Sequence, residues 1–449
     1  MVLKKKVHLV SLGCPKARVD AEMMIGQMQA AGFEHTDDPA LADAIVVNTC
    51  SFLQSAVDES IDSILAMSDY KTEGRCQNLV VTGCLPSRYG KELADELPEV
   101  DLFLGTSDID KIAAALLRDL PERTYISEGS FLYDGGNAPR VKSMRGASAY
   151  LKVAEGCSRS CTFCIIPKIR GKQRSRSVTE VLGEARLLAA QGIKEVVLIA
   201  QDLTSYGVDL GDNRSLITLL EGLETIPGLR WVRLMYAYPW NFTDELLSLI
   251  KDSDRVLPYI DMPLQHISDR ILKAMRRNVL REKQLELIDK LRAVPGMVLR
   301  TTLITGFPGE TDAEFQELAD WIQDVEFDRV GVFAYSPEPG TPAAEMPDQV
   351  DPEVAEARRG ALLAIQQGIH EEKMRKMIGE RLEVLVDGPS DEHPLVLEGR
   401  YYGQAPEIDG VVYLSFEDGG SFVRPGEFVE VEIEDASEYD LVGVVLAEP

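Results

Sequence analysis

Short apolar runs alternate with helical stretches over the first 120 residues. Ile45–Val47 and Leu79–Val81 are continuously apolar, and Val7–Val10 is apolar except for His8, which is typical of strands buried on both faces. Strands that alternate with helices usually form one parallel sheet covered by those helices. The pattern predicts an N-terminal parallel α/β domain over residues 5–120.

The same rhythm returns after a connector at residues 121–147, which contains Gly, Pro and Ser. Six further apolar runs are separated by amphipathic stretches such as Val178–Gln191 and Asp312–Gln323. Six β/α units are two short of a closed TIM barrel, so we expect a partial (β/α)6 TIM-like barrel over residues 148–375. Its predicted strands are Tyr150–Val153, Val196–Ile199, Val232–Tyr236, Pro258–Asp261, Val298–Ile304 and Val330–Tyr335.

The end of the chain has a different pattern. A predicted long helix, Pro352–Met377, precedes five short apolar runs separated by Gly, Pro and Asp. This predicts a five-stranded antiparallel β-barrel of OB-like size over residues 376–446, so the whole chain is an α/β multidomain protein. The predicted strands are Leu382–Val386, Leu395–Glu398, Val411–Leu414, Phe428–Ile433 and Leu441–Leu446.

Charge narrows the range of partners. The chain has a formal net charge of −27, and the residues from Lys376 onward carry 4 Lys and Arg against 18 Asp and Glu. Such a surface is unsuited to a broad hold on nucleic acid phosphates, and it indicates either a solvated acidic face or a basic partner. No apolar run approaches the roughly 18 residues of a membrane span, so we expect a cytoplasmic protein with no membrane contact.

Six of the seven cysteines form two groups of three. Cys14, Cys50 and Cys84 each follow one of the N-terminal apolar runs, and parallel strands bring their carboxyl ends to one edge of a sheet. The three thiols are therefore expected to meet, although buried structural cysteines remain an alternative. Cys76 ends no predicted strand and is expected to have no special role.

The second group, Cys157, Cys161 and Cys164, has the spacing C-x3-C-x2-C and directly follows a predicted strand. A structural zinc site normally has four protein ligands. A 4Fe-4S cube is also normally held by four thiolates, so three would leave one iron open for another ligand. The spacing favours an open catalytic cluster, with structural zinc and a purely electron-carrying cluster as alternatives.

This cysteine spacing after the first strand of a partial barrel resembles the radical S-adenosylmethionine superfamily. The order of all three domains resembles its methylthiotransferase family, whose terminal barrel is called TRAM. The resemblance implies that Cys157, Cys161 and Cys164 hold a 4Fe-4S cluster that binds S-adenosyl-L-methionine and cleaves it to a 5′-deoxyadenosyl radical. It also implies that Cys14, Cys50 and Cys84 hold a second 4Fe-4S cluster that handles sulfur, and that Phe163 lies near the adenine.

Four motifs resemble one branch of that family. They are Ser11–Lys16 followed by Val19-Asp20, and residues 201–207, 262–266 and 305–311. That branch methylthiolates the β-carbon of an aspartate in the small-subunit ribosomal protein S-twelve, whereas transfer-RNA methylthiotransferases of the MiaB type typically have Gly-Cys-Gln-x-Asn at the first motif.

The acidic terminal barrel also favours this basic ribosomal protein over transfer RNA. The resemblance implies S-twelve as the partner, together with an external electron donor and a sulfide source, and no direct nucleic-acid binding is expected. The transfer-RNA activity is the alternative.

Several polar residues at predicted strand ends are candidates for cofactor contacts. Gln201, Asp202 and Arg300 could reach S-adenosyl-L-methionine, although polar turn chemistry is an equal alternative. One dense basic run follows the central cysteines, and we expect it either to meet carboxylates of the cofactor or substrate or to form a solvated loop. Its members are Lys168, Arg170, Lys172, Arg174 and Arg176.

Overall fold

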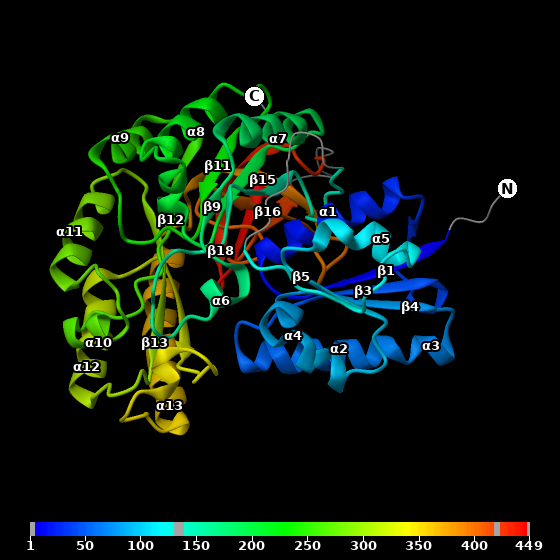
Figure 1. The fold of residues 1–449 in the computed structure, drawn as a ribbon. Helices are drawn as coiled ribbons and strands as arrows, with labels where there is room; N and C mark the ends of the chain where they lie inside the picture. The colour runs from blue at the N-terminus through cyan, green and yellow to red at the C-terminus, as the bar shows by residue number, and fades with distance from the viewer. Residues whose placement is uncertain (1–4, 130–138, 417–422, 447–449) are drawn as a thin grey trace.

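The computed structural model describes residues 5–129, 139–416 and 423–446 and confirms the expected three-part architecture. Two six-stranded parallel sheets and a closed five-stranded barrel form the framework. In Figure 1 the N-terminal domain (blue to cyan) lies against the open side of the central barrel (green to yellow), and the terminal barrel (orange to red) lies beside the central sheet.

The N-terminal domain has a fully parallel sheet in the order β2-β1-β3-β4-β5-β6. Helices α1 (Pro15–Ala30) and α5 (Ile112–Leu117) cover one face, while α2 (Gln54–Ser68) and α4 (Cys84–Glu96) cover the other. The short α3 (Tyr70–Glu73) follows α2. The strands are β1 (Lys6–Ser11), β2 (Glu34–His35), β3 (Ala44–Thr49), β4 (Asn78–Gly83), β5 (Leu102–Gly105) and β6 (Thr124–Tyr125).

Helix α1 is buried on almost all sides. Pro15 fits its first turn because proline lacks the N–H that would be unpaired there. Met24 and Met28 belong to a core that also includes Tyr150 and Ile199 of the central domain. The helix is therefore packed between two domains, and this explains why its sequence has no clear polar face.

The central domain is an open parallel barrel with strand order β14-β13-β12-β11-β10-β7. In β10, Val196 and Leu198 pack against the outer helices, while Val197 and Ile199 face the core shared with α1. The strands are β7 (Ser148–Lys152), β10 (Glu195–Ile199), β11 (Trp231–Leu234), β12 (Val256–Asp261), β13 (Val298–Thr305) and β14 (Arg329–Ala334). A separate hairpin pairs β8 (Ala154–Glu155) with β9 (Arg174–Ser175).

Seven helices accompany these strands, and α6 (Ile166–Arg170) lies beside α4 at the junction of the two domains (Figure 1). The others lie on the outer side of the barrel. They are α7 (Val178–Ala190), α8 (Ser215–Glu224), α9 (Asp244–Asp252), α10 (Asp269–Ala274), α11 (Arg281–Arg292) and α12 (Asp312–Val325). None of the helices in the described part of the chain has the length and apolar character required to cross a bilayer.

The terminal barrel follows the long helix α13 (Pro352–Arg375) and closes in the order β15-β16-β17-β19-β18. All neighbouring pairs are antiparallel except β17 and β19, which run parallel. Closure leaves no exposed strand edge. The strands are β15 (Arg381–Pro389), β16 (Leu397–Tyr401), β17 (Val412–Phe416), β18 (Phe428–Ala436) and β19 (Leu441–Val445).

A buried ion network joins this barrel to the central sheet. Glu195 of β10 pairs with Arg233 of β11 at 2.8 Å and with Arg400 of β16 at 2.8 Å. Arg400 also pairs with Asp387 at 2.7 Å. Burial opposes ionisation of Glu195, but the two guanidinium charges outweigh it and lower its pKa to about 2.

The predicted connector is partly packed. Its residues 130–138 lie outside the described residues, but Arg140 pairs with Glu22 of α1 and Glu184 of α7, each at 2.6 Å. Gly26 of α1 permits this approach, since a Cβ there would lie 2.0 Å from the Pro139 carbonyl oxygen. The described part of the connector thus fixes α1 to the central domain.

We expect Glu195→Gln to destabilise the protein by about 3–5 kcal/mol, because it leaves the buried Arg233 and Arg400 charges without their shared carboxylate. Chemical denaturation measures this loss. The matched control is Glu245→Gln, which removes an exposed partner of Arg214 and should cost less than about 1 kcal/mol. Equal effects of the two variants would contradict a stabilising role of the buried network.

Candidate functional site

The structure brings Cys14, Cys50 and Cys84, the N-terminal triplet, to the carboxyl edge of the first sheet. Cys14 immediately precedes α1, Cys50 follows β3, and Cys84 begins α4 directly after β4. A Cβ on Gly13 would lie 3.0 Å from the Cys50 Cβ, so glycine at φ +97° permits the close approach of the Cys14 loop. The thiols lie close enough that Cys14 and Cys50 both raise the pKa of Cys84.

The three thiols have different acidities. Burial and neighbouring thiols raise the pKa of Cys84 to about 12, although Arg170 donates to its Sγ at 3.4 Å. Burial also raises the pKa of Cys14, but the charges of Lys16 and Arg170 and the first amides of α1 outweigh burial and lower it overall. Cys14 is therefore the thiol of this triplet that most readily becomes a thiolate.

The central triplet, Cys157, Cys161 and Cys164, lies in the loop between β8 and α6. Burial is the main cause that raises the pKa of Cys157 to about 11 and of Cys164 to about 12, and Cys161 adds to both shifts. Arg277 approaches Cys161, with its Nη1 3.9 Å from the Sγ. These mutual effects show that the three thiols face one another.

A buried network of Asp20, Lys152, Glu155 and Arg170, the junction network, links the regions of the two triplets. Arg170 pairs with Asp20 at 3.3 Å and with Glu155 at 3.0 Å, and Lys152 pairs with Glu155 at 2.8 Å and with Asp20. None of the four side chains is more than 5% exposed. Burial opposes ionisation of Glu155, but the two cations outweigh it and hold its pKa well below its usual range.

Both triplets consist of three thiols, and thiolates are the usual ligands of iron–sulfur clusters. The donor chemistry of both triplets therefore fits an iron–sulfur cluster. Within residues 5–129, 139–416 and 423–446, no three Cys, His, Asp or Glu side chains are placed as a single-ion site requires.

Gln201 and Asp202, two predicted cofactor contacts, follow β10 and have different surroundings. Gln201 donates to Glu155 at 2.6 Å, while its buried Oε1 atom has no partner among the described residues. That oxygen could accept from a bound ligand. Asp202 instead holds the central cysteine loop, since it accepts from Arg159 Nε at 2.7 Å.

Phe163 and Arg300 lie in different places. Phe163 is half-buried and packs against an apolar cluster that includes Met275 and Phe307, so it provides an apolar wall beside the central triplet. Arg300 pairs with Asp261 at 2.9 Å and lines a cavity of about 350 Å³ between β13, β14, α13 and the terminal barrel. The structure therefore groups Phe163 with the central cysteines and places Arg300 toward the terminal barrel.

The expectation for the basic run is wrong for two of its members. Arg170 and Arg176 are only 2% and 3% exposed, so they belong neither to a solvated loop nor to an open anion-binding patch. Arg170 joins the junction network, and Arg176 pairs with Glu184 at 2.5 Å. Lys168 is exposed and donates to the Gly340 carbonyl. The sequence could not show that the run crosses from surface to interior.

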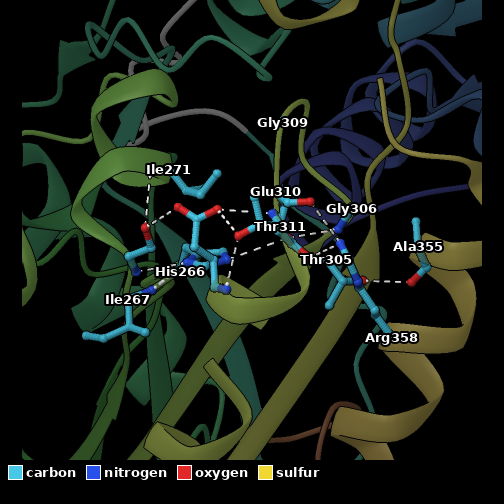
Figure 2. Close-up of polar contacts among 12 residues, drawn as sticks. His266, Ile267, Ile271, Thr305, Gly306, Gly309, Glu310, Thr311, Ala355 and Arg358 are labelled. Atoms are coloured by element: carbon cyan, nitrogen blue, oxygen red, sulfur yellow. Dashed lines mark hydrogen bonds and ion pairs between the residues drawn. The ribbon is translucent and has the colours of Figure 1, made fainter. Parts of the chain in front are cut away.

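The motifs at residues 262–266 and 305–311 form a buried structural contact (Figure 2). His266 Nδ1 accepts from the amides of Ile267 and Ser268, so its Nε2 carries the proton and points toward Glu310 at 3.5 Å. Glu310 also accepts from the Gly306 amide at 2.9 Å and from Arg358 of α13 at 2.8 Å. This arrangement indicates a structural role for the two motifs, because it ties two loops at strand ends to α13.

Cys76 is confirmed as separate from both triplets. It is 4% exposed in the core between the N-terminal sheet and its outer helices, and its Sγ lies 3.6 Å from the Asn78 carbonyl oxygen.

Comparison with known proteins gives matches over the whole chain. Residues 6–105 match the family described as uncharacterized protein family UPF0004, residues 151–322 the radical SAM superfamily, and residues 378–446 the TRAM domain. The chain is 50% identical to the ribosomal protein uS12 methylthiotransferase RimO of Anaeromyxobacter sp. (strain Fw109-5), covering 98% of this chain and 93% of that protein. The RimO proteins of Geobacter sulfurreducens and Geotalea uraniireducens are 48% and 47% identical, with 99% of each chain covered.

The chain belongs to the RimO family. Among solved structures, the radical S-adenosylmethionine methyltransferase TsrM of Kitasatospora setae, solved with cobalamin and a [4Fe-4S] cluster, superposes with a TM-score of 0.55. It is 14% identical, and the match covers 86% of this chain and 82% of TsrM. This likeness concerns the fold alone.

The sequence did not single out several residues that lie near the two triplets in this RimO-family chain. Lys16 lies over the Tyr236 ring, with 2.9 Å between its Nζ and the ring centroid, and Arg277 approaches Cys161. Glu155 precedes the central triplet by two positions, a proximity that could have signalled its importance. Tyr236 could not be found this way, since only the fold brings it to α1.

In reduced, metal-free protein, we expect iodoacetamide to label Cys14 several-fold faster than Cys84 or Cys164. The thiolate is the reactive form, and only Cys14 of these three has a lowered pKa. Peptide mass spectrometry over a time course measures the rates. Lys16→Gln should slow Cys14, because it removes a charge that lowers the pKa, and faster labelling of Cys84 would contradict the assignment.

Proposed function

We propose that this chain methylthiolates the β-carbon of an aspartate in ribosomal protein uS12, the S-twelve protein of the small subunit. The observation that carries the proposal is the pair of thiol triplets linked by the buried junction network, in a chain up to 50% identical to RimO proteins. The reaction replaces a C–H bond by C–S–CH3, so it requires hydrogen abstraction as well as sulfur and methyl supply at neighbouring positions.

In this proposal Cys157, Cys161 and Cys164 hold the 4Fe-4S cluster that binds S-adenosyl-L-methionine, within the radical domain at residues 148–375. The N-terminal triplet, within residues 5–120, holds a second 4Fe-4S cluster. When bound, these groups supply the radical that abstracts hydrogen, the inserted sulfur and the methyl group. Three thiolates per cluster leave one iron open in each case.

The residues of the chain hold these groups in a dry and rigid setting. Phe163 provides an apolar wall, Gln201 offers an unpaired oxygen, and Asp202 fixes Arg159 of the cysteine loop. Arg170 places a permanent positive charge beside Cys84, which favours its thiolate. Arg300 pairs with Asp261 and lies toward the terminal barrel, so the arrangement of its described neighbours gives no support to a cofactor contact.

The terminal barrel, residues 376–446, suits a basic protein substrate. Acidic side chains such as Glu430, Glu434 and Glu438 are exposed on it. Opposite charges steer partners together and raise the association rate. We place the reaction in the cytoplasm, with an external electron donor and sulfide source, and with uS12 rather than nucleic acid as the binding partner.

We expect about eight iron atoms per chain after anaerobic reconstitution, because two four-iron cubes are held. Replacing Cys157, Cys161 and Cys164 together by Ala should halve this content and abolish 5′-deoxyadenosine formation. Replacing Cys14, Cys50 and Cys84 should also halve the iron. Colorimetric iron assay and chromatography measure both quantities, with Cys76→Ala as the matched control that retains full iron.

The same enzyme, incubated with reductant and S-adenosyl-L-methionine, should add a methylthio group to uS12, detected by mass spectrometry. Parallel reactions with transfer RNA test the MiaB-type alternative. Modification of transfer RNA without modification of uS12 would contradict uS12 as the substrate and favour the MiaB-type activity. An unchanged iron content in both triple cysteine variants would contradict the cluster assignment.

Association with uS12 should slow as salt concentration rises, because the attraction of the acidic barrel is screened. The triple variant Glu430→Gln, Glu434→Gln and Glu438→Gln should lower the association rate several-fold at low salt while leaving iron content unchanged. Stopped-flow or surface-based kinetics measure the rate. The matched control replaces Glu221, Glu245 and Glu286 by Gln on the outer helices, and an equal effect would contradict specific steering by the barrel.

A further inference from the structure

One cavity, the interface cavity, lies between the central domain and the terminal barrel. Its volume is about 350 Å³, which is in the range of small-molecule sites. Its lining includes Arg329 and Gly331 at the start of β14 and Asp409 of the terminal barrel, and no cysteine of the described part of the chain is among the lining residues. The cavity is therefore at the amino end of β14, whereas the two thiol triplets follow the carboxyl ends of their strands.

Arg329 is held in place and retains a donor that a ligand can use. Its Nη1 atom donates to His370 Nδ1 at 2.8 Å and to the Asp328 carbonyl oxygen at 3.0 Å. Burial and the charge of Arg329 lower the pKa of His370 to about 4, so this ring is neutral at neutral pH. The Nη2 atom of Arg329 is buried and has no hydrogen-bond partner among the described residues. Arg329 can therefore donate a charge-assisted hydrogen bond to a carboxylate.

The interface cavity also has two acceptor oxygens. Gln366 of α13 is 6% exposed, and its Nε2 donates to the Phe327 carbonyl oxygen at 2.9 Å, while its Oε1 has no partner in the described part of the chain. Asp409 accepts from the Tyr259 hydroxyl through Oδ2 at 2.7 Å. Its Oδ1 lies 3.7 Å from Arg329 Nε, which is longer than a hydrogen bond. Both oxygens can accept from an ammonium group.

Open space and apolar side chains complete the cavity. Residues two apart in a strand face the same side, so a Cβ on Gly331 would point to the side of Arg329. Apart from chain neighbours, one described atom would lie within 4 Å of this Cβ, Thr302 Oγ1 at 3.8 Å. Leu363 of α13 and Ile408 of the terminal barrel contribute apolar lining. The cavity thus combines a cation, two acceptors and an apolar wall.

We propose that the interface cavity binds a free amino acid with an apolar side chain. Arg329 holds the carboxylate, Gln366 and Asp409 accept from the ammonium, and Leu363 and Ile408 contact the side chain. A free amino acid presents all three kinds of group from one carbon atom. This site goes beyond the proposed reaction and does not depend on it. Because the ligand contacts both the central domain and the terminal barrel, it stabilises the packing of the two.

The test measures the binding of three related probes to the anaerobically reconstituted enzyme by isothermal titration calorimetry. The probes are L-leucine, L-leucinamide, which lacks the carboxylate, and isocaproate, which lacks the ammonium. We expect L-leucine to bind and each of the other two to bind at least about tenfold more weakly, because each leaves a buried polar group unpaired. L-Leucine should also raise the melting temperature of the enzyme.

Two variants change the interface cavity in different ways. Arg329→Met removes the cation, and Gly331→Leu fills the space without changing a charge. Each should weaken L-leucine binding at least about tenfold, and melting curves without ligand show that each variant is folded. The matched control is Arg281→Met, which removes an exposed arginine of α11 and should leave L-leucine binding unchanged.

Absence of L-leucine binding at about 10 mM would overturn the inference, as would binding that both cavity variants retain. Equal affinity for isocaproate or L-leucinamide would overturn the assignment to an amino acid. S-Adenosyl-L-methionine carries the same carboxylate and ammonium, so its displacement of L-leucine would show that the cavity serves the cofactor and would also overturn the inference. Failure of the proposed function is distinguishable, since these measurements contain no uS12.

Discussion

The site depends on one interaction, the buried pairing of Asp20 with Lys152 and Arg170 across the boundary between the first two domains. Asp20 belongs to α1, whose first turn follows Cys14, while Arg170 ends α6, which follows the central cysteine loop. Breaking one member of such a network leaves an uncompensated charge in the interior, so the two domains are held in one relative position. Chemistry shared between two cofactors requires this fixed geometry.

The fold was largely predictable, because each predicted strand is a short apolar run and the six central runs are the strands of the observed parallel barrel. The grouping of the cysteines was predictable for the same reason, since a thiol that follows a parallel strand must lie at the carboxyl edge of its sheet. The short edge strand β2 (Glu34–His35) was not predictable, because two polar residues are too few to show a periodic pattern.

The roles of charged residues were much harder to predict. The basic run at residues 168–176 was expected to meet carboxylates of the cofactor or substrate or to form a solvated loop. Two of its members, Arg170 and Arg176, instead enter the interior, where Asp20, Glu155 and Glu184 neutralise them. These partners are up to 150 residues away in sequence, so only the tertiary structure reveals them. Arg300 was a candidate on its strand position alone, and its partner Asp261 lies on the neighbouring strand.

Helix α1 is buried on almost all sides, and its core is continuous with the central sheet and with Leu385 and Ala405 of the terminal barrel. Each part also has a hydrophobic cluster of its own, and the shared core couples the three of them. The TRAM barrel is accordingly part of the scaffold that packs against the other two domains. Evolution could exchange the acidic side chains on its outer surface for basic ones and so change the partner, while the inner surface must stay matched to the domains beneath it.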